Sequence, residues 1–587
     1  SDSQLPAVYP LTDAEDDTLV FESRFESGNL RRAIQVFRYE YDLILRPDIN
    51  TRGHTQWFYF SVRNMRPGNK YKFNIINMMK PDSLYNEGLL PCFYSEKHVE
   101  ATGIGWHRRG ERVGYYQNQI RRKNGTYYTL SFTLEFPYET DTAFLAHCYP
   151  YTLTDLNTYL ARLENDPKRR LRFRRRVLCQ SLAGNDVDLL TITSFSADPE
   201  ALRSRKGILI TSRVHPGETN ASWMMKGLID YLTGSSLDAQ ILRDNFVFKI
   251  VPMLNPDGVV NGNYRCCLSG QDLNRQWIEP SKRLNASIYY TKMMLKRFQL
   301  DRQVVMYCDF HGHSRKKNIF IYGCDGGKLY PSCRLREKVF PCLLWKNAEV
   351  FSYRDCHFKV QRCKESTGRV VVWRECGIVN SFTMEASFCG ADFGSHSNVH
   401  FNTEHYQQMG HFFCDTILDL YDPDQTKVES VLKELQLDME GEDNDDDEGE
   451  DDSSSGDEVV KRPKPKKTKA KKDKGQGQRV ASAKVMGNNA RRPPSGRVPT
   501  ASSARDKTTS MTTATQPRTS TAPTRAKRSQ SAATMNTRTQ RDQPRPHRAA
   551  SATERKPRGD RVERAEPSAR TGSERRRGGG DTDTSSG

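Results

Sequence analysis

The sequence predicts a mixed α/β sheet flanked by helices, preceded by a β-sandwich domain and followed by a disordered tail. Three observations predict this arrangement. Short segments rich in Tyr, Phe, Ile and Thr fill residues 15–150, which is typical of an antiparallel β domain. Apolar runs then alternate with helical periodicity over residues 151–422, which indicates parallel strands. Residues 461–587 contain no Leu, Ile, Phe, Tyr or Trp.

The N-terminal domain, residues 15–150, is expected to be a β-sandwich. Turn residues such as Pro67-Gly68-Asn69 and Asn124-Gly125 separate its apolar segments, as is usual between short strands. The strands that the sequence predicts are Tyr39–Leu45, Gln56–Val62, Tyr71–Ile76 and Tyr127–Phe136.

The second domain, residues 151–422, is expected to alternate strands and helices around one sheet. The predicted helices are Tyr151–Leu163, Ala221–Leu232 and a closing helix at Phe412–Tyr421. The predicted strands are Gly207–Val214, Phe246–Leu254, Val304–Asp309, Asn318–Tyr322, Val370–Trp373 and Ser381–Phe388.

The end of the chain carries two blocks of opposite charge. Residues 423–460 form a predicted acidic linker, and residues 461–587 form a basic tail that accounts for much of the formal net charge of +18. Without large apolar side chains the tail cannot offset the entropy of ordering, so we expect it to be disordered. It is either a solvated tail or a contact surface for an acidic partner such as a microtubule or nucleic acid.

Cysteine usage and the N-terminal segment favour a cytoplasmic protein. The chain has 14 Cys but no CxxC pair, so neither a disulfide scaffold nor a zinc knuckle is expected. The N-terminal segment lacks the basic start and apolar core of a signal peptide. No window reaches the ~18 consecutive apolar residues of a membrane span. We therefore expect a protein that is neither secreted nor inserted in a membrane.

Metal-ligand residue types stand at the ends of two predicted strands. His215-Pro-Gly-Glu218 follows the strand 207–214, and His311 follows the strand 304–309. Sites in α/β sheets gather at the carboxyl ends of the strands, and two histidines with one carboxylate and an open fourth position make a catalytic zinc site. Each signal is weak alone, because a single His such as His311 or His313 is more often a satisfied core residue.

The residues that follow strengthen this interpretation. Asn255-Pro-Asp-Gly258 comes after the strand 246–254, then Arg265, then Asp272-Leu-Asn-Arg275. Ser381-Phe-Thr-Met-Glu385 places a carboxylate inside an otherwise apolar strand. A buried Glu is costly unless it is paired or takes part in chemistry.

In this order, HPGE, NPDG, DLNR, a later His and a strand Glu resemble the carboxypeptidase A type of zinc metallocarboxypeptidase. More narrowly, RVHPGETNASW, MLNPDGVVNGNYR, DFHGHSRKKN and SFTMEASFCG resemble the cytosolic carboxypeptidases, a subfamily of deglutamylases. FESGNLRRA and HTQWFYFSV resemble the N-terminal domain of that subfamily. The resemblance covers about residues 15–422 and implies a carboxypeptidase-like sheet.

The resemblance implies a role for each of these polar residues. His215, Glu218 and His311 would hold one Zn²⁺ per chain. Glu385 would be the general base that takes a proton from the attacking water. Arg265 would stabilise the negative charge that develops on the scissile carbonyl oxygen.

The resemblance also implies a substrate pocket. Asn274 and Arg275 would hold the terminal carboxylate of the substrate, which would make the enzyme an exopeptidase. Counting back 15 positions from Glu385 reaches Val370 at the expected pocket floor. Its neighbour Arg369 is expected to select acidic side chains, unless it points to solvent.

One position departs from the carboxypeptidase A pattern. That pattern has a Tyr 22 positions before the catalytic Glu, where this chain has Cys363. The sequence does not identify a replacement. His313, two positions after a predicted ligand, either lines the cleft or supports the loop.

The implied function is the removal of C-terminal or side-chain glutamates from protein tails, and tubulin is the main expected substrate. The expected partners are polyglutamylated tubulin or other Glu-rich tails, with microtubule contact through the basic tail and a place at microtubules, cilia or centrioles. We expect a monomer without a membrane partner. Specific nucleic-acid binding is not expected, because residues 461–587 offer no aromatic ring for base stacking.

Two alternatives stay open. A zinc amidase of the aspartoacylase type also uses HxxE and a later His, and activity on an N-acyl amino acid would reveal it. A non-enzymatic microtubule-binding protein with an inactive peptidase domain would show neither zinc nor turnover. The NPDG and DLNR segments argue against the first, and the complete set of His215, Glu218, His311 and Glu385 argues against the second.

Overall fold

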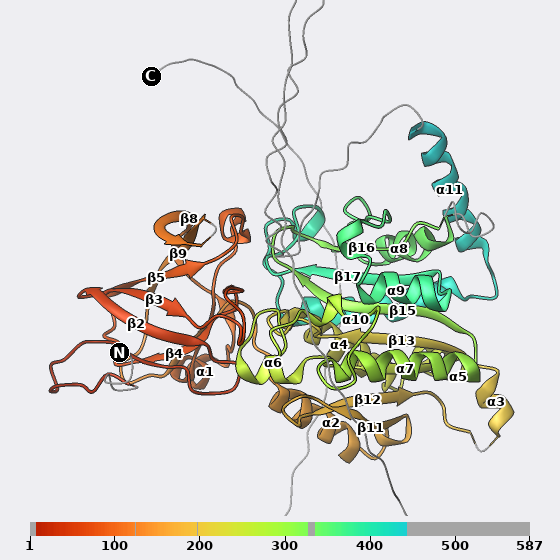
Figure 1. Cartoon of the computed structure of the whole chain (residues 1–587), viewed down its shortest axis with the longest axis horizontal. Coiled ribbons are helices and arrows are strands. Elements are labelled where there is room, and N and C mark those ends of the chain that lie inside the picture. The colour runs from red at the N-terminus through yellow and green to blue at the C-terminus, as the bar shows by residue number, and fades with distance from the viewer. Residues whose placement is uncertain (1–7, 124, 197, 327–334, 443–587) are drawn as a thin grey trace, which may run out of the picture. The chain divides into compact units, whose positions relative to one another are not determined.

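The computed structural model describes residues 8–123, 125–196, 198–326 and 335–442. These residues form an N-terminal β domain and a larger α/β domain (Figure 1). Within them, no helix combines the length and the apolar character needed to cross a membrane. The predicted basic tail, residues 461–587, and the acidic residues from 443 onward lie outside the described residues.

The N-terminal domain consists of two five-stranded sheets, which confirms the predicted β-sandwich. The first sheet, in spatial order, is β1 (Val20–Glu22), β4 (Tyr59–Arg63), β10 (Ala143–Ala146), β6 (Cys92–Ser95) and β7 (His107–Arg108). The second is β2 (Leu30–Phe37), β3 (Glu40–Leu45), β5 (Lys70–Met78), β9 (Gly125–Glu135) and β8 (Glu111–Arg122). The short helix α1 (Glu96–Thr102) follows β6.

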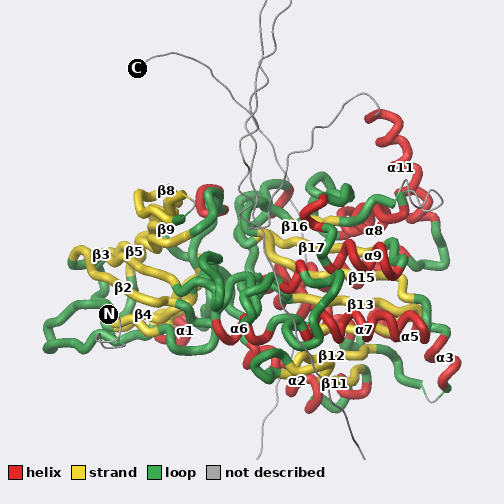
Figure 2. The backbone as a smooth tube through the Cα atoms, viewed as in Figure 1, coloured by secondary structure: helices red, strands yellow, loops and turns green. Residues whose placement is uncertain are grey.

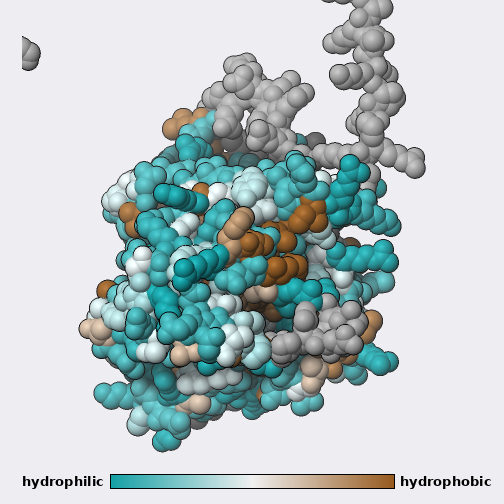
Figure 3. Space-filling view, turned by 90° about the vertical axis from the view of Figure 1, so that its left-hand side faces the viewer, coloured by the Kyte–Doolittle hydropathy of each residue, from teal (hydrophilic) through white to brown (hydrophobic). Residues whose placement is uncertain are grey.

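Aromatic residues fill the space between these two sheets. Phe21 of β1 and Phe73 of β5 come from different sheets, and their ring centroids lie 6.3 Å apart in an edge-on contact. Phe60, Phe73 and Phe132 have no exposed surface. The alternation of buried and partly buried residues in β3 gives the period of two that is typical of a strand with one face in the core. Figure 3 views the molecule from the side of this domain, where most of the surface is hydrophilic around a group of apolar side chains.

The second domain contains one mixed seven-stranded sheet, as the sequence predicts. Its spatial order is β11 (Phe173–Gln180), β12 (Asp186–Ile192), β14 (Phe246–Val251), β13 (Lys206–Ser212), β15 (Val304–His313), β17 (Asn380–Ser387) and β16 (Ile319–Tyr322). The central strands β14, β13, β15 and β17 are parallel, and the strands at both edges pair antiparallel.

Helices cover both faces of this sheet (Figures 1 and 2). Side chains of β13 alternate between the two faces. Ile208 and Ile210 belong to the hydrophobic cluster formed with the helices of one face, and Leu209 belongs to the cluster formed with the helices of the other face. The first face carries α4 (Thr219–Leu232), α5 (Leu237–Asn245), α8 (Arg336–Asn347) and α10 (Thr403–Leu420), and the second carries α7 (Ala286–Asp301) and α9 (Gly368–Cys376). The remaining helices are α2 (Leu153–Asn165), α3 (Pro199–Arg203), α6 (Pro256–Asn261) and α11 (Thr426–Glu442).

The prediction of a strand at Val370–Trp373 is wrong, because these residues lie within helix α9. The run of β-branched residues suggested a strand, but all four side chains are buried: Val371 and Val372 in one cluster, Val370 and Trp373 in another. Four consecutive buried apolar residues show neither the helical nor the strand period, so a run this short cannot be assigned from sequence. Gly377, at φ 65°, ends the helix.

The folded part also continues beyond residue 422, where the sequence places the start of the acidic linker. Helix α11 packs Val431 and Leu435 against Val339 and Leu343 of α8. These few apolar side chains, spaced at helical intervals in a mostly polar segment, are enough to dock the helix. The linker prediction therefore fails for the described residues 426–438.

Candidate functional site

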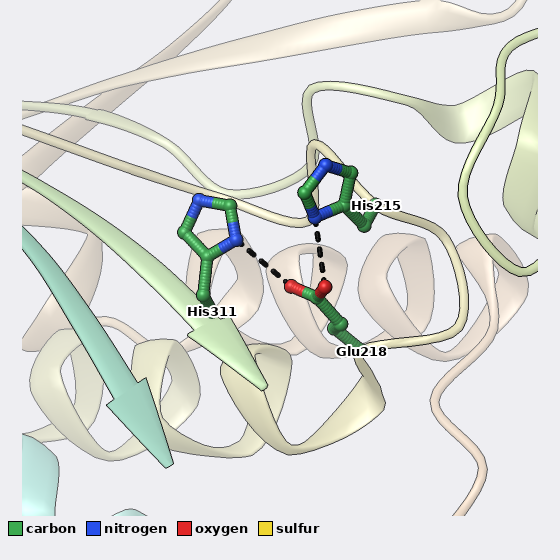
Figure 4. Close-up of side chains that lie close together, drawn as sticks. All are labelled: His215, Glu218 and His311. Carbon is green, nitrogen blue, oxygen red and sulfur yellow. Dashed lines mark hydrogen bonds and ion pairs between the residues drawn. The ribbon is translucent and has the colours of Figure 1, made fainter. Parts of the chain in front are cut away.

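His215, Glu218 and His311 lie together, as the sequence predicts (Figure 4). His215 lies in the loop between β13 and α4, Glu218 stands at the N-cap of α4, and His311 belongs to β15. The Nδ1 atom of His215 lies 2.7 Å from Glu218 Oε1, and Nδ1 of His311 lies 2.9 Å from Glu218 Oε2. All three residues are at most 5% exposed.

The loop that carries His215 is held in shape by the buried side chain of Arg213. Its Nε donates to the carbonyl of Pro216 at 2.9 Å, and its Nη1 donates to the carbonyl of Tyr151 at 2.8 Å. Arg213 itself has φ 59°, an uncommon conformation for a non-glycine residue that the surrounding contacts must stabilise. Gly217 leaves no room for a side chain, because a Cβ there would lie 2.6 Å from the Tyr264 ring.

Each histidine of this group is oriented by a second carboxylate on its other nitrogen. Nε2 of His215 lies 3.1 Å from Asp272 Oδ1, and Nε2 of His311 lies 2.7 Å from Asp309 Oδ2. This leaves both Nδ1 atoms directed at the Glu218 carboxylate. Carboxylate–histidine pairs of this kind fix the tautomer and orientation of metal-binding histidines.

The three residues therefore fit a zinc ion. Their ligand atoms all lie within 4.8 Å of one another, and a ligand carboxylate must be ionised to bind. Burial opposes ionisation of Glu218, but the charges of His215 and His311 more than offset it and hold its pKa well below the usual range. The donor set of two histidines and one carboxylate matches a catalytic rather than a structural zinc site.

The sequence interpretation missed the roles of Asp309 and Asp272. Asp309 stands two positions before His311 in β15, so both side chains lie on the same face of the strand. That spacing, in an apolar strand, was the available signal. Asp272 belongs to the DLNR motif, but nothing in the sequence shows that it contacts His215.

We predict that Asp309→Asn weakens zinc binding by about 10- to 100-fold. The substitution removes the negative charge beside Nε2 of His311. The single amide oxygen of Asn also cannot accept from both His311 Nε2 and Thr211 Oγ1, which lies 2.7 Å from Asp309 Oδ1. Zinc affinity should be measured by competition with a chromophoric chelator. Asp301→Asn, at the exposed end of α7, is the matched control. Equal zinc affinity of the two variants would contradict the role of Asp309.

Glu385 lies beside the candidate metal ligands. It is the register partner of His311 across the parallel strands β15 and β17 and lines the same pocket. Burial, reinforced by the nearby Glu218 carboxylate, raises the pKa of Glu385 to about 7, although His311 and His215 oppose this shift. A carboxyl group with such a pKa can both accept and donate a proton near neutral pH.

The predicted substrate-binding residues are brought to the same place. Arg265 Nη2 lies 2.7 Å from Asp272 Oδ2, and Arg275 Nη1 lies 3.8 Å from the same oxygen. Asn274 Oδ1 accepts a 3.0 Å bond from the backbone N–H of Gly368. The amide oxygen of Asn274 is thereby engaged, and its nitrogen is the end that can donate to an anion.

A pocket of about 580 Å³ joins all eight predicted site residues. Its lining carries more cations than carboxylates: Arg265, Arg275, Lys338, Lys359, Lys364 and Arg369 against Glu218, Asp325 and Glu385. Burial, together with the charges of Arg275 and Arg265, lowers the pKa of Lys364 to about 8. Cations that are crowded together in this way favour a ligand with negative charge.

The structure also places three residues, Arg369, Cys363 and His313, whose surroundings the sequence left open. Arg369 does not point to solvent: it is 5% exposed, donates to the carbonyl of Gly323 and lies 5.7 Å from the Tyr322 ring centroid. Cys363 is exposed and is not part of the described pocket lining. Both suggestions for His313, lining the cleft and supporting the loop, are confirmed. It lines the pocket, and its Nδ1 accepts a 2.9 Å hydrogen bond from the backbone N–H of Lys316.

Comparisons with known proteins agree with this geometry. A family model described as zinc carboxypeptidase matches residues 156–332, and one described as cytosolic carboxypeptidase N-terminal domain matches residues 21–147. Cytosolic carboxypeptidase 3 of Bos taurus is 51% identical over 421 residues, which are 72% of this chain and 42% of that protein. Cytosolic carboxypeptidase 2 of Homo sapiens is 51% identical over 423 residues, 72% of this chain and 47% of that protein. The chain thus spans about half the length of these curated relatives.

Solved structures share the fold at lower identity. A metallo-carboxypeptidase from Burkholderia cenocepacia matches with a TM-score of 0.57 at 21% identity, over 69% of this chain and 99% of that chain. A metallo-carboxypeptidase from Pseudomonas aeruginosa, in complex with (2-guanidinoethylmercapto)succinic acid, matches with a TM-score of 0.56 at 24% identity, over 70% of this chain and 99% of that chain.

Proposed function

From the premise that the chain belongs to the zinc carboxypeptidase family, with the N-terminal domain of the cytosolic carboxypeptidases, we propose that it is a zinc-dependent metallocarboxypeptidase. We propose glutamates at the C-terminus or on side chains of Glu-rich protein tails, such as those of polyglutamylated tubulin, as its substrates. The observation that carries the proposal is the placement of Glu385, and of a lining with more cations than carboxylates, around the group His215, Glu218 and His311.

The residues of the pocket divide the chemistry among them. One zinc ion per chain, held by His215, Glu218 and His311, would supply a Lewis acid that polarises the scissile carbonyl and makes water more acidic. Glu385 takes a proton from the attacking water and returns it to the leaving amine, which suits its raised pKa. Arg265 offers a fixed positive charge to the carbonyl oxygen as that oxygen becomes negative.

The substrate is held at its end. Asn274 and Arg275 bind the terminal carboxylate, and the planar fork of Arg275 suits two parallel hydrogen bonds. A chain that continued past this point would have no carboxylate to offer, so the proposed enzyme removes terminal residues. The remaining cations of the lining, Lys338, Lys359, Lys364 and Arg369, favour a terminal residue that carries a second carboxylate.

We extend the proposal to the cellular setting. The names of the relatives place them in the cytosol, and we propose the cytoplasm for this chain as well. Contact of the basic residues 461–587 with an acidic partner such as a microtubule is part of the proposal and lies outside the described residues.

The proposal is tested with the purified chain on glutamylated tubulin, with and without a chelator, and with the released and remaining glutamates read by mass spectrometry. We expect the tubulin to lose mass in steps of one glutamate residue, and we expect the chelator to stop this loss. A short peptide ending in Glu and an N-acyl amino acid are run beside it. Turnover of the N-acyl amino acid alone would instead favour the amidase interpretation. If the zinc-loaded chain turned over none of these substrates, the proposal that it is an enzyme would be refuted.

We predict that Arg369→Ala lowers kcat/KM on a peptide ending in Glu about tenfold or more, and much less on one ending in Leu. A charge in a desolvated pocket discriminates strongly between acidic and apolar side chains, and a lost hydrogen bond to a charged group costs about 1.5–3 kcal/mol. Arg374→Ala is the matched control, since Arg374 lies on the same helix but is exposed and paired with Glu365. Equal losses on the two peptides would contradict the selectivity of Arg369.

A further inference from the structure

The N-terminal domain reaches the loop that carries Arg265. Asp48, which follows β3, is 2% exposed, and its carboxylate accepts three backbone hydrogen bonds from the second domain. Oδ1 accepts from Tyr264 at 2.6 Å, and Oδ2 accepts from Arg265 and Cys266, each at 2.7 Å. The proposed catalytic arginine is thus fixed at its backbone by a residue of the other domain.

The same loop is clamped on both sides of Arg265. A Cβ on Gly262 would lie 2.7 Å from the carbonyl oxygen of Gly28, and one on Gly270 would lie 2.6 Å from that of Asn50. Asn50 Nδ2 also donates to the carbonyl of Leu268 at 2.7 Å. Residues 262–270 form neither a long helix nor a strand, so these contacts rather than secondary structure hold the loop.

The contacts continue from Asp48 into the metal-binding group. The carbonyl of Tyr264 accepts a 2.8 Å bond from the backbone N–H of Gly217, within the loop that carries His215. The side chain of Arg265 pairs with Asp272, which in turn contacts His215. Displacement of the loop would therefore move the guanidinium of Arg265 relative to the metal ligands.

Burial and hydrogen bonding act on the charge of this carboxylate in opposite directions. Burial raises the pKa of Asp48 to about 6, although the three N–H donors and Arg265 favour the charged form. An ionised carboxylate is costly to bury, and charge-assisted bonds to N–H groups are stronger than neutral ones. A neutral residue of the same size would hold the three N–H groups less firmly.

We propose that Asp48 is a positioning residue of the active site, through which the N-terminal domain sets the place of Arg265 for the reaction. The proposal rests on the proposed carboxypeptidase function of the second domain. The N-terminal domain then supplies part of the catalytic geometry in addition to its own fold, and its effect is transmitted through Arg265.

The first test is Asp48→Asn in the full, zinc-loaded chain. Loss of one well-placed oxyanion donor lowers kcat by about 10²–10³-fold, and a displaced donor should cost part of that, about 10- to 100-fold. KM and zinc content should stay near those of the unsubstituted chain, because Asn274, Arg275 and the metal ligands are not touched. Asp42→Asn is the matched control: Asp42 accepts a bond from Asn74 within the same domain.

A double-mutant cycle separates positioning from general destabilisation. In an Arg265→Ala background, Asp48→Asn should lower kcat less than twofold further, because its effect passes through Arg265. An equal effect in both backgrounds would overturn the proposal, as would a wild-type kcat for Asp48→Asn. Should Asp48→Asn melt below the assay temperature, Asn50→Ala replaces it, since Asn50 is on the exposed side of the same clamp. The expected result is then a lower kcat at an unchanged melting temperature, and an unchanged kcat would overturn the proposal.

The test distinguishes failure of the positioning role from failure of the proposed function. If the unsubstituted chain turns over no peptide, the carboxypeptidase proposal fails. If it is active and Asp48→Asn behaves like Asp42→Asn, only the positioning role fails.

Discussion

Replacing Glu385 with Gln is expected to lower kcat on a peptide ending in Glu by about 10²–10⁴-fold while the chain keeps its zinc. Gln has the size of Glu but cannot accept the proton of the attacking water. Glu385 is not among the residues whose ligand atoms converge on the metal position, so metal binding should survive. Steady-state kinetics and metal analysis of the same preparation measure both quantities.

Glu365→Gln is the matched control for this substitution. Glu365 is exposed and pairs with Arg374 outside the pocket lining, so its replacement should change neither kcat nor zinc content. Two results would contradict the role of Glu385: full activity of Glu385→Gln, or loss of zinc together with activity, which would make Glu385 a ligand instead.

Removal of zinc by chelation, or the substitution His215→Ala, is expected to abolish turnover and lower the melting temperature. His215, Glu218 and His311 hold buried polar atoms close together, and buried polar groups are costly without their partner. A ligand present at about 1,000 times its Kd adds about 4 kcal/mol to the free energy of unfolding. Metal analysis, activity and scanning calorimetry measure the three effects.

Added zinc should restore the chelated chain but not His215→Ala, because only the latter lacks a ligand. His396→Ala is the control, since His396 lies outside the group and near Glu349. A chelated chain that keeps its activity would show that the reaction does not depend on the metal. Activity of His215→Ala with a full equivalent of zinc would show that the ligand set is a different one.

Several elements could be predicted because their signals are local. The apolar run before His215 predicted β13, and the run before His311 predicted β15, although that strand continues through His313. Helix α4 follows from apolar residues at helical spacing after Glu218. These segments are long or strongly apolar, so packing in the folded protein did not alter their secondary structure.

Other elements depended on their surroundings. The valine run at residues 370–372 lies in helix α9 because it is buried between two clusters. Helix α11 packs against α8 through a few apolar side chains in a mostly polar segment. The strands β11 and β12 were missed because Arg-rich and Asp-rich residues interrupt their apolar pattern.

The sequence by itself determined the order of the sheet-forming segments and the residue types that meet at the metal position, because strand runs and HxxE spacing are properties of neighbouring residues. Only the tertiary structure decided which groups support them. Asp309 and Asp272 became partners of the histidines, and Lys338, Lys359 and Lys364 became part of one pocket, by the packing of distant segments. Asp48 lies 217 positions from Arg265, and no local pattern encodes a contact that only the folded chain brings together.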